Sequence, residues 1–140
     1  ENYNEGELKK AVYFAKKLEK LEGEFWVPGA LLNFHIYYDI GDYLNAERIL
    51  TLALKIAPTN LQFLSLMASL KFEKKYTDAI SYSSQILQLG KSQLRALLIL
   101  GLSHLNLGNK KEANMILSKY LTMDSENKFA KEGLKRLKNF

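Results

Sequence analysis

Hydrophobic residues recur along this chain at the spacing of one face of an α-helix. The clearest case is residues 94–127, where two periodic segments flank the polar turn Gly108–Asn109–Lys110–Lys111. The second segment has apolar or small residues at steps of 0, 3, 4, 7 and 8, at Ala113, Ile116, Leu117, Tyr120 and Leu121. The first segment repeats these steps at Leu97, Leu100, Gly101, His104 and Leu105. The pattern predicts a hairpin of two helices that pack through their apolar faces.

The same hairpin pattern recurs along the rest of the chain. A small residue opens each second helix, and successive copies lie 35, 33 and 34 positions apart, at Ala11, Ala46, Ala79 and Ala113. A helix–turn–helix unit that recurs about every 34 residues is typical of stacked helical repeats. Each unit then buries its apolar face against its neighbours.

At these positions the chain resembles the tetratricopeptide repeat (TPR) family. The residues that carry the resemblance are Gly41, Asp42, Tyr43, Ala46 and Pro58, then Tyr76 and Ala79, then Leu97, Leu100, Gly101, Gly108 and Ala113. The resemblance implies an all-α fold, a TPR-like α-solenoid of antiparallel helical hairpins with a C-terminal capping helix. It also shows departures. The family usually has Trp early in the first helix and Gly four residues later. Ala30, Phe63 and Leu97 stand at the Trp position, and only Gly101 keeps the glycine, with Phe34 and Met67 at the other two.

The repeats divide the chain into segments of one predicted domain, residues 1–140. Residues 1–26 form the second helix of a partial repeat, expected over Glu7–Leu21 and ending near Gly23. Repeat one covers 27–59, repeat two 60–93 and repeat three 94–127, and 128–140 form the capping helix. We expect eight helices and no strands. Because the chain starts in the middle of a repeat and not at Met, it is interpreted as a fragment or a processed form.

Several residues are candidates for helix ends and for packing beneath a turn. Polar side chains of suitable type precede or open the predicted helices, at Asp42, Asn60, Thr77 or Asp78, and Ser125. Gly90 is a candidate C-cap, and Pro28 fits the first turn of its helix. Phe25 and Trp26 are predicted as core anchors under that turn.

The amino-acid composition is ordinary for a globular protein. Hydrophobic residues make up 47% of its 140 positions and charged residues 25%, with no cysteine. No apolar run reaches the roughly 18–20 residues of a membrane span. We favour a soluble, cytoplasmic protein, and a periplasmic or envelope-associated location stays open. Lysine outnumbers arginine by 17 to 3, a bias that suggests a bacterial genome rich in lysine codons.

No arrangement of residues indicates catalysis, a metal or another cofactor. The two histidines, His35 and His104, lie in different repeats, and neither has a second ligand at metal-like spacing. His104 lies on the inward stripe and is interpreted as a core histidine. Glycines occur one per turn and form no phosphate-binding loop. The chain is therefore interpreted as a protein without enzymatic activity.

The resemblance places a binding groove on the first helices of successive repeats. The groove residues that it implies are Leu31, His35, Tyr38, Leu64, Ala68, Lys71, Arg95, Leu98, Leu102 and Leu105. Three sets of these residues are spaced by steps of 4 and then 3, which places the members of each set on one helix face. The sets are Leu31, His35 and Tyr38, then Leu64, Ala68 and Lys71, then Leu98, Leu102 and Leu105. The face is largely apolar and suits an apolar or amphipathic segment. Some family members bind chaperone C-termini through a clamp of Lys, Asn and Arg. Only Arg95 fits that clamp here, which argues against this kind of adaptor.

These features predict a scaffold or adaptor that binds a protein or peptide in the groove. Three alternatives stay open: an interaction module of a larger enzyme or envelope-associated protein, a self-associating protein, and a secretion-type chaperone for apolar segments. Lysine pairs near the turns, Lys9–Lys10, Lys74–Lys75 and Lys110–Lys111, form a candidate basic ridge. The scarcity of arginine and of stacking aromatic residues argues against nucleic acid as a partner.

Overall fold

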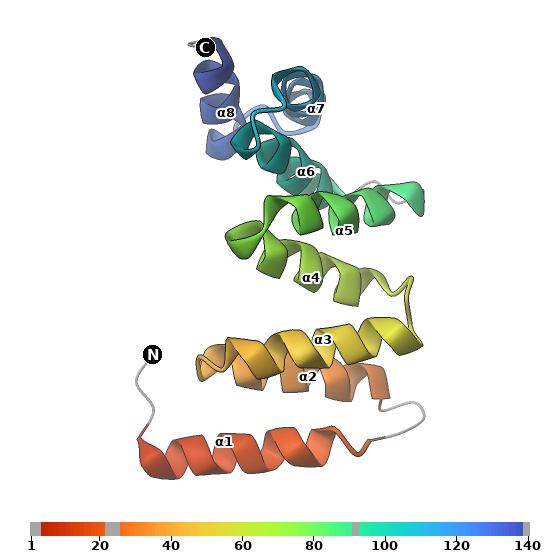
Figure 1. The fold of residues 1–140 in the computed structure, drawn as a ribbon, viewed down its shortest axis with the longest axis vertical. Coiled ribbons are helices and arrows are strands. Elements are labelled where there is room, and N and C mark those ends of the chain that lie inside the picture. The colour runs from red at the N-terminus through yellow and green to blue at the C-terminus, as the bar shows by residue number, and fades with distance from the viewer. Residues whose placement is uncertain (1–3, 22–25, 91–92, 139–140) are drawn as a thin grey trace. The chain divides into compact units, whose positions relative to one another are not determined.

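The computed structural model describes residues 4–21, 26–90 and 93–138, and these residues form eight α-helices without a strand (Figure 1). The helices are α1 (Glu5–Leu18), α2 (Trp26–Asp39), α3 (Tyr43–Ile56), α4 (Leu61–Lys74), α5 (Tyr76–Gln88), α6 (Leu94–Asn106), α7 (Lys110–Met123) and α8 (Lys128–Lys138). The chain divides into two compact units, Glu1–Phe63 (unit 1) and Leu64–Phe140 (unit 2). Helix α4 begins in unit 1 and continues into unit 2.

Within each unit, helices that follow one another in the chain pack together. In unit 1 α2 contacts both α1 and α3, and in unit 2 α6 contacts α5 and α7 while α8 contacts both α6 and α7. The predicted all-α fold of TPR-like antiparallel hairpins with a C-terminal capping helix is confirmed. The last helix closes unit 2, because it covers two helices of the preceding hairpin at once.

Close packing in the hairpins depends on residues without a large side chain. The alanines that open the second helices, Ala46, Ala79 and Ala113, are 0% exposed. Gly101 of α6 lies directly against α7, because a Cβ atom built on it would lie 2.7 Å from Leu117 Cδ2 and 3.1 Å from Ile116 Cγ2. The repeat pattern therefore marks the positions where neighbouring helix backbones approach each other most closely.

Two of the predicted turns end their helices in the same way. Gly41 and Gly108 both adopt φ of 83°, a conformation that favours glycine. Beside them, Asp42 N donates to Tyr37 O at 2.9 Å and Asn109 N donates to His104 O at 2.9 Å. These bonds satisfy carbonyl groups that a helix end leaves without partners.

The predicted helix starts are correct in two cases. The Asp42 side chain accepts from Asn45 N at 3.2 Å, and the Asn60 side chain accepts from Phe63 N at 3.1 Å. Both residues therefore act as the predicted N-caps. Pro28 lies in the first turn of α2, and its neighbour Trp26 meets Phe63 edge-on at 5.7 Å between ring centroids. Trp26 is half-buried, and Phe25 and Gly23 lie outside the described residues.

Other predicted helix starts are wrong. Helix α1 runs over Glu5–Leu18 and not Glu7–Leu21, because Asn4 and Glu7 form a reciprocal capping box around Gly6. Helix α5 starts at Tyr76 without a side-chain cap, so Thr77 and Asp78 lie in its first turn. The pair Lys9–Lys10 lies inside α1 and not at a turn, which interrupts the predicted basic ridge.

The predicted cap of the last helix, Ser125, is also wrong, because Asn127 performs that role. Asn127 Oδ1 accepts from Ala130 N at 3.0 Å, and its Nδ2 donates to the Tyr120 hydroxyl at 3.2 Å. The same hydroxyl donates to Asp124 Oδ2 at 2.9 Å. Tyr120 is buried, and burial together with the Asp124 carboxylate raises the pKa of its hydroxyl above the ordinary value of 10.0. One phenol thus joins the end of α7 to the start of α8.

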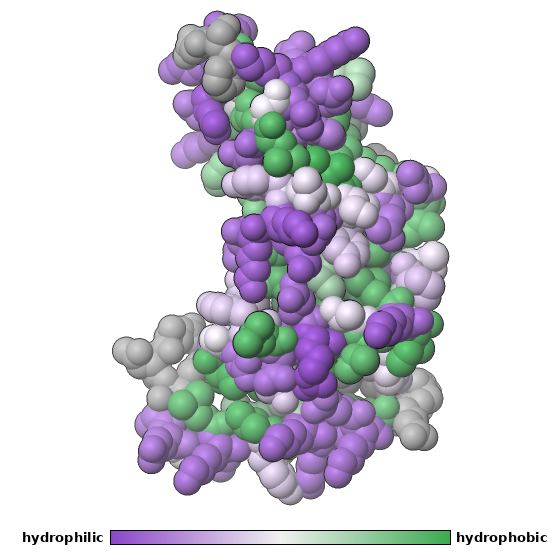
Figure 2. All heavy atoms as spheres, in the orientation of Figure 1, coloured by the Kyte–Doolittle hydropathy of each residue, from purple (hydrophilic) through white to green (hydrophobic). Residues whose placement is uncertain are grey.

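Charge in unit 2 gathers on its C-terminal helices. Residues 71–140 hold 13 basic and 6 acidic residues, whereas residues 1–70 hold 7 and 9. On the face that Figure 2 shows, hydrophilic residues predominate over α7 and α8. The side chain of Lys131 pairs with Glu126 at 3.3 Å. Ion pairs at such exposed positions contribute little to stability.

We predict that Gly101→Val destabilises the protein by about 1–3 kcal/mol, because the new side chain overpacks the α6–α7 contact. Gly6→Val is the matched control, since its Cβ atom meets only Asn4 Oδ1 at 3.4 Å. That control changes stability by roughly 0.5 kcal/mol or less. Urea unfolding followed by circular dichroism measures both. Equal effects of the two substitutions would contradict the packing role of Gly101.

The Tyr120 hydroxyl predicts a dependence of stability on alkaline pH. A phenol whose pKa is raised on folding stabilises the folded state fully below the unfolded pKa near 10.0, and this stabilisation disappears as pH rises through the folded pKa. Tyr120→Phe should cost about 1 kcal/mol at about pH 8 through the lost hydrogen bonds. The difference from wild type should shrink toward about pH 11. Urea unfolding of both proteins across this range checks the prediction, and a constant difference would contradict it.

Candidate functional site

The predicted groove residues differ widely in their exposure. Three of them, Leu64, Ala68 and Leu105, are 1%, 1% and 4% exposed. Side chains this deeply buried offer no surface to a partner, so these three residues belong to the core instead. His35 and Arg95 are exposed, and the half-buried positions are Leu31, Tyr38, Lys71, Leu98 and Leu102.

In unit 1 the predicted residues of α2 lie beside a cluster of aromatic rings. Tyr38 stacks on Phe34 at 5.7 Å between centroids and meets Tyr43 of α3 edge-on at 5.1 Å. His35 lies edge-on to Phe34 at 5.3 Å and is exposed. This face of α2 therefore offers an imidazole and a phenol that neighbouring rings hold in position.

In unit 2 two hydrogen bonds between side chains join the first helices of successive repeats. Arg95 Nε donates to Ser69 Oγ at 3.1 Å, and Ser65 Oγ donates to Gln93 Oε1 at 3.4 Å. The first-helix surface is defined here as these four residues together with Leu98. Four of its five members are polar, and three of these, Ser65, Ser69 and Gln93, were not among the predicted groove residues.

Two further groove residues of unit 2 face other helices. A Cβ atom built on Gly133 of α8 would lie 3.5 Å from Leu102 Cδ2, so α8 covers Leu102. Lys71 Nζ lies 3.9 Å from the Asp78 carboxylate of α5. Arg95 and Leu98 are the predicted residues of unit 2 that keep accessible surface next to each other on one helix.

His104 does not lie in the core as predicted. It is half-buried, and Asn109 Nδ2 donates to its Nδ1 at 3.1 Å for the tautomer with an unprotonated Nδ1. The imidazole thus supports the turn between α6 and α7. Among the described residues no group of three His, Cys, Asp or Glu side chains could hold a metal ion.

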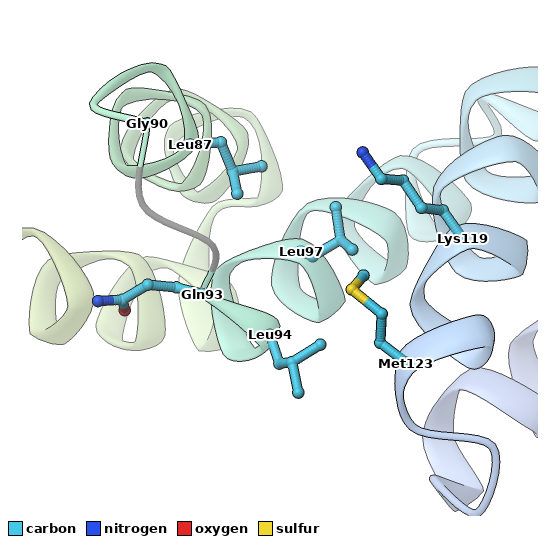
Figure 3. A pocket seen from close by; sticks show the side chains of 7 residues that line it. All are labelled: Leu87, Gly90, Gln93, Leu94, Leu97, Lys119 and Met123. Atoms are coloured by element: carbon cyan, nitrogen blue, oxygen red, sulfur yellow. The ribbon is translucent and has the colours of Figure 1, made fainter.

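The sequence did not predict two pockets that lie between consecutive second helices. In unit 2, a cavity of about 320 Å³ lies among α5, α6 and α7. Figure 3 shows Leu87, Leu97 and Met123 extending toward one another from these helices, while Gln93 points away. In unit 1, a cavity of about 200 Å³ is lined by Leu18, Glu19, Trp26, Ala30, Asn33, Ile49, Leu52, Ala53 and Ile56.

The two pockets occupy equivalent places in the repeat. Ala30 and Ile56 line the pocket of unit 1, and Leu97 and Met123 line the pocket of unit 2. Leu97 follows Ala30 by 67 positions, and Met123 follows Ile56 by the same number. Ala30 and Leu97 stand where TPR proteins usually have Trp. A side chain smaller than Trp leaves space against the two flanking helices. The departure from the family pattern was the signal in the sequence that could have indicated these pockets.

Part of the chain is similar to a known protein. No model of a protein family matches it. The chain is 32% identical over 95 residues to the heat shock protein STI1 of Saccharomyces cerevisiae. This match covers 66% of the chain and 16% of the yeast protein. The chain therefore spans about one sixth of the length of this curated relative. The bacterial origin inferred from the lysine bias stays a prediction.

None of the helices in residues 4–21, 26–90 and 93–138 has the length and apolar character needed to cross a bilayer.

We predict that Ala30→Phe stabilises the protein by about 0.5–2 kcal/mol, because the ring fills the pocket of unit 1 with apolar surface. Lys55→Phe is the control, since it adds the same ring to an exposed position of α3. Thermal and urea unfolding compare the two variants with wild type. A loss of stability in Ala30→Phe would contradict the presence of an accessible cavity beside Ala30.

Proposed function

We propose that this chain is a non-catalytic protein-interaction module that holds a segment of a partner on the first helices of its repeats. The observation that carries the proposal is the pair of hydrogen bonds between α4 and α6, Arg95–Ser69 and Ser65–Gln93. They hold two first helices in a fixed relation, so the first-helix surface needs little ordering when a partner binds. A surface ordered in advance loses less entropy on binding.

The chemistry of this surface limits the partner segment. Arg95 uses Nε for Ser69, and the other N–H groups of its guanidinium can donate to a carboxylate. Leu98 lies on the same helix within one turn and is half-buried. A segment with an apolar side chain next to an acidic group suits this combination. In unit 1, Leu31, His35 and Tyr38 remain a proposed contact surface of α2.

An interaction module within a larger protein is the alternative proposal. The match to the yeast heat shock protein covers 16% of that longer protein. That role keeps the same first-helix surface. The name of the relative does not state a partner, and the single fitting clamp residue, Arg95, still argues against recognition of chaperone C-termini.

The charge reversal Arg95→Glu tests the proposal. Arg95 is exposed, so the substitution leaves the core unchanged, and it removes both the guanidinium and its bond to Ser69. Wild type and variant serve as baits in a lysate of the source organism, and captured proteins are identified by mass spectrometry. We expect a protein that wild type captures and Arg95→Glu loses, with affinity reduced about tenfold or more in calorimetry.

Lys128→Glu is the matched control, because it makes the same change of charge at an exposed position of unit 2 on α8. It should capture the partner as wild type does. Equal loss in both variants would indicate attraction by general charge and would contradict the first-helix surface. Equal capture by all three proteins would also contradict it.

A further inference from the structure

The pocket of unit 1 combines apolar walls with one buried polar group that lacks a partner. Its walls come from α1, α2 and α3 and include Trp26, Ile49 and Leu52, with Glu19 at the end of α1. Asn33 of α2 also lines it. Asn33 is 1% exposed, and its Oδ1 atom has no hydrogen-bond partner. Leaving a buried acceptor without a donor costs about 1–3 kcal/mol.

From this combination we propose that the pocket of unit 1 receives the side chain of a tryptophan that a partner protein presents. The indole ring fills the apolar space, and its N–H group donates to Asn33 Oδ1. The inference rests on the proposed interaction function and adds a second binding site to it. The ligand class follows from the size of the pocket, the unpaired acceptor of Asn33 and the surroundings of the opening, since the other acceptor that lines the pocket, the Glu19 carboxylate, is already paired with Arg48.

Size selects a two-ring side chain. Apolar cavities of about 150 Å³ in proteins accept one benzene ring. The pocket of unit 1 has about 200 Å³, which suits the larger indole and is too small for a folded segment. A tryptophan side chain also has one N–H donor and no acceptor. The indole N–H group can therefore donate to the unpaired Oδ1 atom of Asn33. Phenylalanine and leucine have no donor and would leave this oxygen without a partner.

The opening of the pocket indicates a protein as the source of the ring. Leu52 and Ile56, which line the pocket, are 45% and 67% exposed. Their outer surfaces remain uncovered by a lone indole. A peptide that carries the tryptophan can pack its neighbouring apolar residues against them, which adds buried area. Contacts of this kind favour a peptide over a free aromatic molecule.

An ion pair connects two of the helices that bound the pocket. Arg48 Nη1 of α3 lies 2.9 Å from Glu19 Oε1, at the end of α1. The Arg48 Nε atom donates to Asn45 Oδ1 at 2.9 Å, which fixes the guanidinium. The hydrogen bond to Glu19 raises the pKa of the Arg48 guanidinium above its ordinary value. These contacts link the end of α1 to α3, the two helices on either side of the pocket.

The pocket and the proposed contact surface of α2 lie on different sides of that helix. At 100° per residue, the mean direction of Ala30 and Asn33 differs by roughly 140° around the helix axis from the mean direction of Leu31, His35 and Tyr38. A ligand can bind one face while the other is empty. Failure of binding in the pocket and failure of binding on the first helices are therefore distinguishable by substitutions on separate faces.

Nuclear magnetic resonance of the ¹⁵N-labelled chain tests the site with defined probes. Trp26 is the single tryptophan, so its indole N–H signal reports on the pocket directly, together with the side-chain amide of Asn33. The probes are the blocked peptides acetyl-Leu-Trp-Leu-amide and acetyl-Leu-Ala-Leu-amide, with free indole and 1-methylindole. We expect the tryptophan peptide to shift both signals and to bind about tenfold more tightly than the alanine peptide.

The hydrogen bond to Asn33 is tested separately. Indole should bind about fivefold more tightly than 1-methylindole, which lacks the N–H group. In Asn33→Leu this difference in affinity should disappear. The variant therefore distinguishes the effect of the missing N–H donor in 1-methylindole from the effect of the volume of its methyl group. An unchanged preference for indole in Asn33→Leu would overturn the assignment of Asn33.

Filling the pocket provides the second control. Ala30→Phe should abolish the shifts caused by the tryptophan peptide, and unfolding experiments check that the variant is folded. Leu97→Phe makes a similar change at the equivalent position of unit 2 and should leave these shifts intact. Binding that survives Ala30→Phe, or an absence of shifts in wild type, would overturn the site. Binding of free indole without binding of the peptide would overturn the protein source.

Discussion

The rest of the structure depends on the close approach of paired helices at residues that have almost no side chain. Ala46, Ala79 and Ala113 are fully buried, and Gly101 lies against Leu117. A helix pair whose backbones approach this closely has few ways to pack, because interiors tolerate little extra volume. The relation of each second helix to its neighbours is therefore set by these small residues. That relation decides which faces of the first helices remain accessible.

The same constraint explains why the pockets exist. When small residues hold the backbones in place, a neighbouring position with too small a side chain leaves a gap that the helices cannot close. Phe63 is fully buried and lies against Trp26, so a large ring at the family's Trp position fills its surroundings. Ala30 and Leu97 at the corresponding positions each line a pocket. Packing and binding capacity thus follow from one substitution pattern in the repeat.

Local features of the sequence predicted the helices and several of their ends. Hydrophobic spacing indicates which residues share a face, and Asp42 and Asn60 act as caps through side chains only three residues from their donors. Ser125 failed as a cap because Asn127 is held by Tyr120, a contact over seven residues that no local pattern contains.

The groove residues were predicted less well for a related reason. Spacing placed Leu102 and Leu105 on one face of α6, but it contained no information on which element covers that face. Gly133 allows α8 to approach both leucines. A Cβ atom built on it would lie 3.5 Å from Leu102 Cδ2 and 3.2 Å from Leu105 Cδ2. Arg95 is exposed, and its bond to Ser69 depends on how α4 and α6 pack, which the spacing does not contain. Hydrophobic spacing could not predict the pockets, because an alanine and a tryptophan at the same position fit a helical pattern equally well.

The two proposed sites differ in what occupancy does to the fold. A segment bound to the first-helix surface adds contacts outside a packed interior. A tryptophan in the pocket of unit 1 instead completes the packing among α1, α2 and α3, since it occupies the space that Ala30 leaves open. A ligand that binds only the folded state stabilises it by RT ln(1 + [L]/Kd), where [L] is its concentration. The proposed partner would thereby supply the large aromatic side chain that TPR proteins usually have at the position of Ala30. Its binding energy would stabilise the helices of unit 1 directly.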